Sequence, residues 1–347
     1  MSVIRVLEPG MLTTVQDLGR EGFGVRGVSP SGAADAVSLR IGNLIAGNAA
    51  GAAGLEMTLV GGAFVFPEGA TIVLAGSNFG AALDGVPVEV WTVVEAQPGQ
   101  TLRLGATRAG ARCYLCVRGG IAVKLFLGSA STHVLSGLGG FAGRALRKGD
   151  ELFIGDAGTP LLEKQRTAAA SKERPDGPSE VAAYLGSQAG VPVPRKARRL
   201  STRGRNLVAA RSVLRVTAGP QSESFSEEAR RDFYAGRYRV TEASNRLGLR
   251  LQGAAVAARD GSEMISEGVA LGAVQVPEAG QPIILFVEQQ TTGGYPKIAN
   301  VISADFQCLG QLRPRDEVRF ELVTWDAARE LLREQETVLA SEELLFV

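Results

Sequence analysis

A polar segment near the C-terminus holds the residue types best suited to chemistry. Residues 290–302 read Gln-Thr-Thr-Gly-Gly-Tyr-Pro-Lys-Ile-Ala-Asn-Val-Ile and follow the apolar run 283–287. An apolar run before two glycines is typical of a buried strand that delivers polar residues into a turn. We predict here a site for a small anion or a polarised carbonyl; a hairpin turn with a surface lysine is the alternative. The neutral hydrogen-bonding groups and the one positive charge of the site would come from Gln290, Thr291, Thr292, Tyr295 and Lys297.

The glycine pair inside this segment has an expected role of its own. Because glycine has no Cβ, Gly293 and Gly294 can take positive φ and let a ligand approach the backbone closely. We therefore count both glycines among the substrate-binding residues.

Two other places in the sequence could supply charged groups. Asn245 and Arg246 form an amide-plus-guanidinium pair on a predicted turn, and arginine can bind a carboxylate through two parallel hydrogen bonds. Ser31 and Asp35 lie at the start of a predicted helix, where Asp35 could act as an acid or base and the helix amides could hold an anion. The structural alternatives are that Arg246 holds a loop and that Ser31 and Asp35 only cap the helix.

The cysteines and the single histidine limit the possible chemistry. Cys113 and Cys116 have C-x-x-C spacing but lie in a predicted strand, residues 111–117, whose alternation would send the two sulfurs to opposite faces. We therefore expect buried core cysteines. One histidine, His133, excludes zinc sites built from two or three imidazoles, and no metal site is expected. His133 lies among hydroxyl residues in a predicted loop, and we keep it as a reserve candidate for a base.

The composition is that of a soluble globular protein. The chain has 347 residues, of which 45% are apolar and 21% charged, and 37 Lys and Arg residues nearly balance 36 Asp and Glu residues. This balance predicts no attraction to nucleic acid or to an acidic membrane. No uninterrupted apolar stretch is long enough to cross a membrane, and the N-terminus lacks a signal-peptide pattern. We expect a cytoplasmic protein with two domains, since one core rarely serves so many residues.

The elements that must position these residues are mostly short strands. The 44 glycines and the few aromatic residues favour strands joined by turns. Helical periodicity is confined to a stretch from Ser31 to Gly47, to residues 226–234 and to a stretch that begins after Thr324. Because no βαβ alternation occurs, β-barrels are expected. Strands are predicted at residues 63–66, 71–74, 101–104, 114–118, 213–216, 237–240, 273–276, 283–287 and 318–322.

A weak internal repeat indicates two halves of similar design. Ile4-Arg-Val recurs as Leu214-Arg-Val, and Ile72-Val-Leu recurs as Ile283-Ile-Leu at nearly the same offset. Between the halves, residues 161–211 lose periodicity and gather Ala, Ser, Pro, Lys and Arg, as linkers do. A basic cluster in this linker lacks aromatic residues, so we interpret it as a solvated tether and expect no nucleic-acid binding. The predicted domains are residues 1–160 and 212–347.

Four segments together resemble the family of the 5-oxoprolinase C subunit. This family is also described as Kip antagonist proteins and as the second half of the urea carboxylase carboxyltransferase domain. The resemblance covers almost the whole chain and is weakest in the linker. The four segments are Gly-Val-Ser-Pro-Ser-Gly-Ala-Ala-Asp at 27–35, Leu-Gly-Ser-Ala-Ser-Thr at 127–132, Ser-Asn-Arg-Leu-Gly at 244–248, and residues 290–302.

The chain departs from the family pattern at several positions. Ser29 and Ala34 replace a proline and a methionine, and Leu247 replaces a methionine. These changes are compatible with a loop or with an apolar contact. Glu288-Gln289 stands where an Ala-Asp or Asp-Arg type of pair is more familiar, which changes the charge beside the predicted site.

The resemblance implies a mainly β fold of two cyclophilin-like β-barrel domains with few short helices. It also implies a complex with the family's B subunit and, in an oxoprolinase, the A subunit, which together open 5-oxo-L-proline to L-glutamate at the expense of ATP. The chain would then be one component of an amide-ring hydrolase that is catalytic only with its partners. Lys297, Arg246 and Asp35 are our candidate catalytic residues.

Two alternative functions remain open at this point. In a carboxyltransferase, carboxybiotin would pass its carboxyl group to a urea-like amide. A non-catalytic antagonist of a kinase-inhibitor protein would instead need an exposed apolar surface for its partner.

No covalently bound cofactor is expected. The sequence contains no Gly-x-x-x-x-Gly-Lys-Ser/Thr phosphate loop and no Met-Lys-Met segment that resembles a biotin attachment site. We expect ATP to be used by the complex, and biotin to visit the chain only in the carboxyltransferase alternative.

Overall fold

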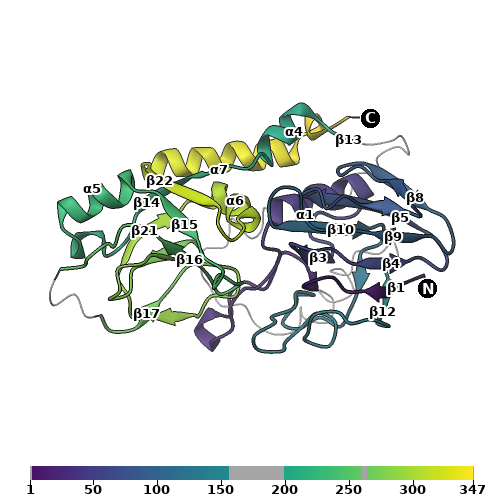
Figure 1. Cartoon of the computed structure of the whole chain (residues 1–347), viewed down its shortest axis with the longest axis horizontal. Coiled ribbons are helices and arrows are strands. Elements are labelled where there is room, and N and C mark those ends of the chain that lie inside the picture. Colours follow the sequence, from purple (N-terminus) through teal and green to yellow (C-terminus); the bar gives the residue numbers. More distant parts are fainter. Residues whose placement is uncertain (1, 156–198, 260–263, 347) are drawn as a thin grey trace, which may run out of the picture.

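The computed structural model describes residues 2–155, 199–259 and 264–346, which form two halves lying side by side (Figure 1). Strands dominate and most helices are short, which confirms the predicted mainly β fold class. Most of the predicted linker, residues 161–198, lies outside the described residues. Within the described ranges, no helix is long and apolar enough to cross a membrane.

The first half contains two sheets that pack around one hydrophobic core. The seven-stranded sheet has the order β11-β12-β1-β4-β9-β6-β7, and the five-stranded sheet has the order β2-β3-β10-β5-β8. A short 3-10 helix, η1 (Gly24–Arg26), follows β2. The strands are β1 (Val3–Glu8), β2 (Thr13–Gln16), β3 (Gly54–Thr58), β4 (Ala63–Val65), β5 (Ala70–Gly76), β6 (Ala82–Leu83), β7 (Val86–Pro87), β8 (Val93–Ala96), β9 (Thr101–Arg103), β10 (Arg112–Val117), β11 (Ile121–Ala122) and β12 (Glu151–Ile154).

Helix α1 (Ala36–Ala46) packs against the five-stranded sheet and explains why β10 is buried on both faces. Cys113 belongs to the core between the sheets, whereas Cys116 belongs to the cluster that includes Ile41 and Ile45 of α1. The two sulfurs therefore lie on opposite faces, as strand alternation predicts. Burial raises the pKa of the Cys113 thiol to about 12, which fits an inert core cysteine.

The second half closes into a barrel with the strand order β14-β21-β18-β19-β16-β15-β22. A separate two-stranded ribbon, β17 (Glu267–Gly268) with β20 (Thr292–Gly293), lies outside the closed barrel. The barrel strands are β14 (Val213–Ala218), β15 (Tyr238–Val240), β16 (Gly248–Gln252), β18 (Ala273–Gln275), β19 (Ile283–Leu285), β21 (Lys297–Val301) and β22 (Glu317–Leu322). The accompanying helices are η2 (Ser222–Ser224), α5 (Glu227–Ala235), η3 (Ser303–Asp305) and α6 (Phe306–Gln311).

The C-terminal helix α7 (Trp325–Ala340) connects the two halves. It runs along the barrel and ends beside the first half (Figure 1), where Glu336 forms an ion pair of 2.7 Å with Arg40 of α1. Val338 and Leu339 pack in the same hydrophobic cluster as Ile41 of α1. The halves therefore share both an ion pair and an apolar contact through α7.

The last part of the predicted linker, residues 199–211, has regular structure. It contains β13 (Arg199–Leu200) and α4 (Thr202–Leu207), and β13 pairs with β23 (Leu345–Phe346), which follows η4 (Glu342–Leu344). This stretch therefore packs with the C-terminus.

The strands and helices predicted from local sequence signals all have counterparts in the structure, although many shorter strands were not predicted. All nine predicted strands coincide with observed strands, and the helices predicted at 226–234 and after Thr324 are confirmed as α5 and α7. The helix predicted to begin near Ser31 is α1, but its cap is Asp35, whose Oδ1 accepts a hydrogen bond of 2.9 Å from the Ser38 amide. The prediction that Ser31 caps this helix is wrong, because its Oγ donates to the Thr132 carbonyl at 2.7 Å.

The repeated sequence segments form strands in both halves but have different neighbours. β1 pairs antiparallel with β12 and β4, whereas β14 pairs antiparallel with β21 and parallel with β22. Sequence similarity between the halves therefore does not extend to one shared strand order.

Candidate functional site

Lys297 is buried at the start of β21. Its side chain is 3% exposed, and Nζ lies 2.6 Å from Oε1 of Glu267 on β17. A buried ammonium needs a partner because desolvation strongly disfavours an isolated charge. The short contact with Lys297 and the hydrogen bond from Gln221 hold the pKa of the Glu267 carboxyl below its usual value. The alternative of a hairpin turn with a surface lysine is therefore wrong.

Three glutamine side chains surround this ion pair. Gln275 lies opposite Lys297 in the β18–β21 pair, and its Oε1 accepts a hydrogen bond of 3.3 Å from Gln290. Gln221 donates to Glu267 at 2.8 Å. Within the described part of the chain, Nε2 of the buried Gln275 has no hydrogen-bond partner. A buried donor of this group is therefore left unpaired.

The β17–β20 ribbon lies over this group, at the end of the barrel opposite α7 (Figure 1). Neither Gly293 nor Gly294 takes positive φ, so that expectation is wrong. Gly293 is instead required by close packing: a Cβ at this position would lie 2.6 Å from Nε2 of Gln275. The close approach to the backbone that we expected of a ligand is made by the chain's own glutamine amide.

The other predicted site residues of the segment 290–302 lie at or near the surface of the protein. Gln290 and Thr292 are exposed, Thr291 is half-buried, and the Tyr295 side chain is 47% exposed. Their role in substrate binding stays a prediction, and they are accessible to a ligand or to a partner chain.

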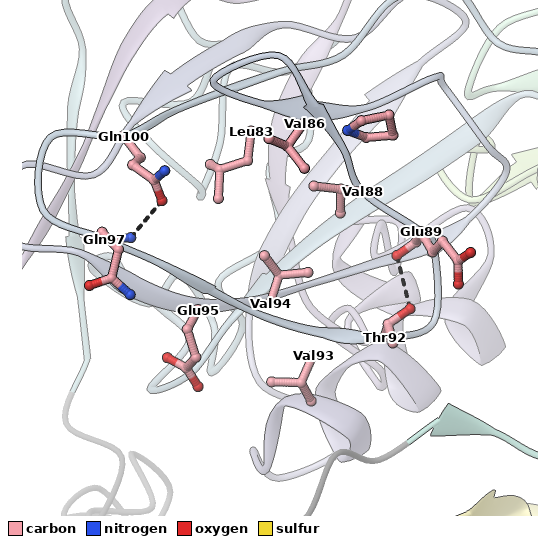
Figure 2. Close-up of a pocket in the computed structure, with 11 residues that line it drawn as sticks. Leu83, Val86, Val88, Glu89, Thr92, Val93, Val94, Glu95, Gln97 and Gln100 are labelled. Carbon is pink, nitrogen blue, oxygen red and sulfur yellow. Dashed lines mark hydrogen bonds between the residues drawn. The ribbon is translucent and has the colours of Figure 1, made fainter.

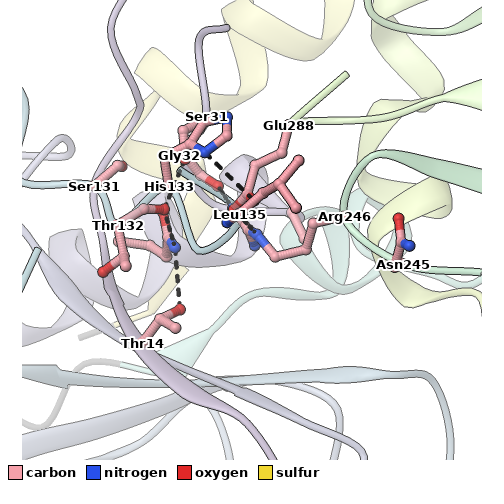
Figure 3. Close-up of polar contacts among 12 residues, drawn as sticks. Thr14, Ser31, Gly32, Ser131, Thr132, His133, Leu135, Asn245, Arg246 and Glu288 are labelled. Atoms are coloured by element: carbon pink, nitrogen blue, oxygen red, sulfur yellow. Dashed lines mark hydrogen bonds and ion pairs between the residues drawn. The ribbon is translucent and has the colours of Figure 1, made fainter. Parts of the chain in front are cut away.

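Arg246 lies in a second cluster, at the seam between the two halves (Figure 3). Its guanidinium donates to Glu288 at 2.5 Å within the second half, and to Glu56 of β3 at 2.5 Å and the Gly32 carbonyl at 2.7 Å in the first half. Burial disfavours the charged form, but the carboxylates of Glu56 and Glu288 outweigh this effect and raise the pKa of Arg246. These contacts fit the alternative that Arg246 holds a loop.

Asn245 does not share the seam with Arg246. Its side chain is exposed and points away from the cluster (Figure 3), and its Oδ1 accepts a hydrogen bond of 2.8 Å from the Leu247 amide. The predicted amide-plus-guanidinium pair is therefore separated in space, and Asn245 stabilises its own turn.

Asp35 is also a seam residue. It is 2% exposed, and its Oδ2 accepts hydrogen bonds from Ser38 Oγ at 2.6 Å and from Gln311 of α6 at 2.7 Å. Burial raises the pKa of Asp35 despite these hydrogen bonds. Its contacts are those of a helix cap that also joins the halves, while an acid or base role for Asp35 stays a prediction.

His133 lies beside the same seam. Its Nδ1 accepts a hydrogen bond of 3.1 Å from the Ser136 amide, so Nε2 carries the proton and donates to Ser29 Oγ at 2.7 Å. Burial lowers the pKa of His133, against the pull of the Glu288 carboxylate 3.9 Å away. In this tautomer His133 cannot accept the Ser29 proton, so the pair is not a nucleophile with its base.

A shallow groove of about 470 Å³ lies on the first half, between the edge strands β7 and β8 (Figure 2). Val86, Val88 and Val94 make much of its lining apolar. None of the predicted site residues lines this groove, so it is separate from both polar clusters. In the described ranges, no group of three or more His, Cys, Asp and Glu residues could hold a metal ion.

The comparisons with known proteins define the class of this chain. Residues 26–322 match the model of the carboxyltransferase domain, subdomain A and B. The chain belongs to this family, as the resemblance of its motifs predicts.

Individual relatives match almost the whole chain. It is 32% identical over 338 residues to the 5-oxoprolinase C subunit of Haemophilus influenzae, covering 97% of this chain and 96% of that protein. It is 34% identical over 334 residues to the 5-oxoprolinase C subunit of Escherichia coli, covering 96% of each. The crystal structure of K. lactis urea amidolyase superimposes with a TM-score of 0.81 at 27% identity over 99% of this chain, which corresponds to 21% of that much longer protein.

Several residues of the two clusters are absent from the set of site residues predicted from the sequence, among them Glu56, Glu267, Gln275 and Glu288. Only Glu288 carries a clear signal, namely the changed charge just before residues 290–302. Glu56 lies in a buried strand, where an acidic residue signals a buried partner. Glu267 and Gln275 carry no local pattern that distinguishes them.

Proposed function

We propose that the chain is the C subunit of an ATP-dependent 5-oxoprolinase complex, which opens 5-oxo-L-proline to L-glutamate. The observation that carries this proposal is the buried Lys297 ammonium, which already holds a carboxylate. The substrate presents a carboxylate and an amide carbonyl, and either oxygen-rich group matches a site of fixed donors. The full-length similarity to two proteins named as the C subunit of 5-oxoprolinase supports the proposal.

Opening the ring requires water to add to the amide carbonyl and the ring C–N bond to break, with the nitrogen leaving as an amine. Negative charge develops on an oxygen during this change, and a desolvated cation stabilises it better than a hydrated one. Lys297 is our candidate for a residue that binds substrate oxygen. The exposed Thr292 and Tyr295 would complete the site together with loops of a partner chain.

The proposal includes partners. We assign the B subunit, and with it the A subunit, as the chains that complete the enzyme, and we assign ATP binding to no residue of this chain. A cytoplasmic location and the domain boundaries at residues 160 and 212 remain part of the proposal, because they were inferred from the sequence.

The test is ATP-dependent release of glutamate from 5-oxo-L-proline by the chain reconstituted with the A and B subunits. Lys297→Met keeps the length of the side chain and removes its charge. We expect a loss of turnover of at least about a hundredfold, as for the loss of a donor to developing charge. Lys148→Met, at an exposed lysine of the first half, is the matched control and should keep full activity. No release of glutamate by the assembled wild-type complex would reject the proposed function. Unchanged turnover in an assembled Lys297→Met complex would reject the role of Lys297 in it.

A second candidate function has a specific observation in its favour. The superposition on urea amidolyase supports a carboxyltransferase, in which the donors at Lys297 would face a carboxyl group delivered by biotin. Biotin would then supply the carboxyl group, and this chain would bind and orient it. Carboxyl transfer from carboxybiotin to urea, without glutamate release from 5-oxo-L-proline, would select this candidate.

A further inference from the structure

The surroundings of Lys297 resemble a carboxylate site that is already filled by the chain itself. Glu267 is 44% exposed, yet its carboxylate reaches the 3% exposed ammonium at 2.6 Å and also accepts from Gln221. An exposed glutamate usually remains in water, where an ion pair contributes little. Here the partner is buried, so Glu267 supplies the negative charge that the ammonium requires.

A second donor beside Lys297 is left without an acceptor. Gln275 faces Lys297 across the β18–β21 pair, and side chains of directly opposed residues lie on the same face of a sheet. Gln290 donates to Oε1 of Gln275 at 3.3 Å, and Nε2 is the other polar atom of the Gln275 amide. Across the described residues this Nε2 atom has no acceptor, although Gln275 is 1% exposed. Leaving a buried donor unpaired is costly, so an acceptor from outside is expected.

The ion pair itself leaves hydrogen-bonding capacity unused. The Lys297 ammonium has three N–H groups, and Glu267 is its one polar side-chain contact among the described residues. The ribbon that carries Glu267 also carries Gly293, which packs on Nε2 of Gln275. One short ribbon therefore covers both donors.

We propose that Glu267 occupies the position of a ligand carboxylate, and that Lys297 and Gln275 are the two donors that bind this carboxylate when Glu267 gives way. The ligand class is a small monocarboxylate. The identity of the ligand as 5-oxo-L-proline rests on the proposed function, whereas the carboxylate site does not. Gln275 then becomes a binding residue that lies outside the 290–302 segment.

The experiment removes the internal carboxylate and supplies one from solution. Binding of 5-oxo-L-proline to the purified full chain is measured by calorimetry, and thermal stability is followed against potassium acetate with potassium chloride as the ionic-strength control. Glu267→Ala should bind 5-oxo-L-proline about tenfold more tightly than the wild type, because no tethered group competes. Its melting temperature should rise with acetate more than with chloride. Glu267→Gln keeps the shape and the contact to Gln221, and should show the same effects to a smaller degree.

Matched ligands and variants isolate the carboxylate and its two donors. 2-Pyrrolidinone has the same ring without the carboxylate and should bind Glu267→Ala no better than the wild type. In the Glu267→Ala background, Lys297→Met should abolish binding and Gln275→Leu should weaken it about tenfold, as for a lost hydrogen bond to a charged group. Glu242→Ala removes an exposed glutamate paired with the exposed Arg315, and should behave as the wild type.

The outcomes separate this inference from the proposed function. Equal binding by Glu267→Ala and the wild type, equal effects of 2-pyrrolidinone, or no effect of Gln275→Leu would each overturn the inference. None of these measurements uses ATP or a partner. Carboxylate binding by Glu267→Ala, together with no turnover of 5-oxo-L-proline in the reconstituted complex, would keep the inference and reject the proposed function.

Discussion

Replacing Arg246 by methionine should destabilise the protein more than any other single change at the seam. The guanidinium is buried and has three acceptors: the carboxylates of Glu56 and Glu288 and the carbonyl of Gly32. Arg246→Met keeps most of the apolar volume but leaves two buried carboxylates without this cation. Removing one partner of a buried ion pair costs about 3–5 kcal/mol.

The neighbouring Arg112 determines how much free energy of unfolding is lost within this range. Its Nε lies 3.8 Å from Oε1 of Glu56, so one carboxylate keeps a cation nearby. Burial lowers the pKa of Arg112, with Glu56 opposing this effect. We therefore expect a loss of about 3 kcal/mol in the free energy of unfolding, a large part of the roughly 5–15 kcal/mol typical of a folded protein.

Urea unfolding followed by tryptophan fluorescence measures this loss. The chain has two tryptophans, and Trp91 is buried in the first half, so its signal reports the half that does not contain Arg246. Arg250→Met is the matched control, because Arg250 is an exposed arginine of β16 in the same half as Arg246. The control should lie within about 0.5 kcal/mol of the wild type.

A double variant tests whether the loss arises from uncompensated buried charge. Glu56→Gln removes one of the two uncompensated charges, so Arg246→Met with Glu56→Gln should be more stable than Arg246→Met alone. A loss below about 1 kcal/mol in Arg246→Met, or a double variant whose losses simply add, would refute the argument that the guanidinium compensates buried carboxylates.

Three further predictions concern the other buried groups. Burial raises the pKa of Asp35 above 3.8, so at pH values just above 3.8 the native state binds more protons than the unfolded state. The stability advantage of the wild type over Asp35→Asn, measured by urea unfolding, should therefore shrink as the pH rises through this window. Burial lowers the pKa of His133 in the native state below 6.5, so the unfolded state binds more protons between the native and unfolded pKa values. The free energy of unfolding should therefore fall as the pH drops below 6.5. His133→Gln should remove this pH dependence, since the chain has no other histidine. Burial raises the pKa values of the thiols of Cys113, Cys116 and Cys308, so they should not react with a thiol reagent until the protein is denatured. A thiol that reacts in the native protein would contradict their assignment to the core.

The sequence predicts those features of the fold that depend on the pattern of neighbouring residues. Strand and helix positions follow from periodicity and capping residues, and Ser226 and Thr324 cap α5 and α7 as their residue types suggest. The C-x-x-C pair could be assigned to the core because strand alternation fixes the face of each side chain. The cap of α1 is harder to predict, because Ser31 and Asp35 are both good capping residues and only tertiary contacts decide between them.

The composition of each polar cluster could not be predicted, because its members are distant in sequence. Arg246 and Glu56 are separated by 190 residues, and Asp35 and Gln311 by 276. Neither pair produces a local pattern, because nothing in the sequence around one residue identifies the other. A buried glutamate in β3 could be recognised as unusual, but its partner could not be named.

The two clusters are joined by the chain that leads into the polar segment 290–302. Glu288 holds Arg246 at the seam, and two residues later Gln290 donates to Gln275 beside Lys297. Because the seam fixes Glu288 through an arginine that also binds the first half, the position of Gln290 depends on how the two halves are packed. The position of Gln275 Nε2, which has no acceptor among the described residues, therefore depends in part on how the halves pack. If Lys297 binds substrate as proposed, Arg246 then has the complementary role of fixing the start of the segment that ends at Lys297.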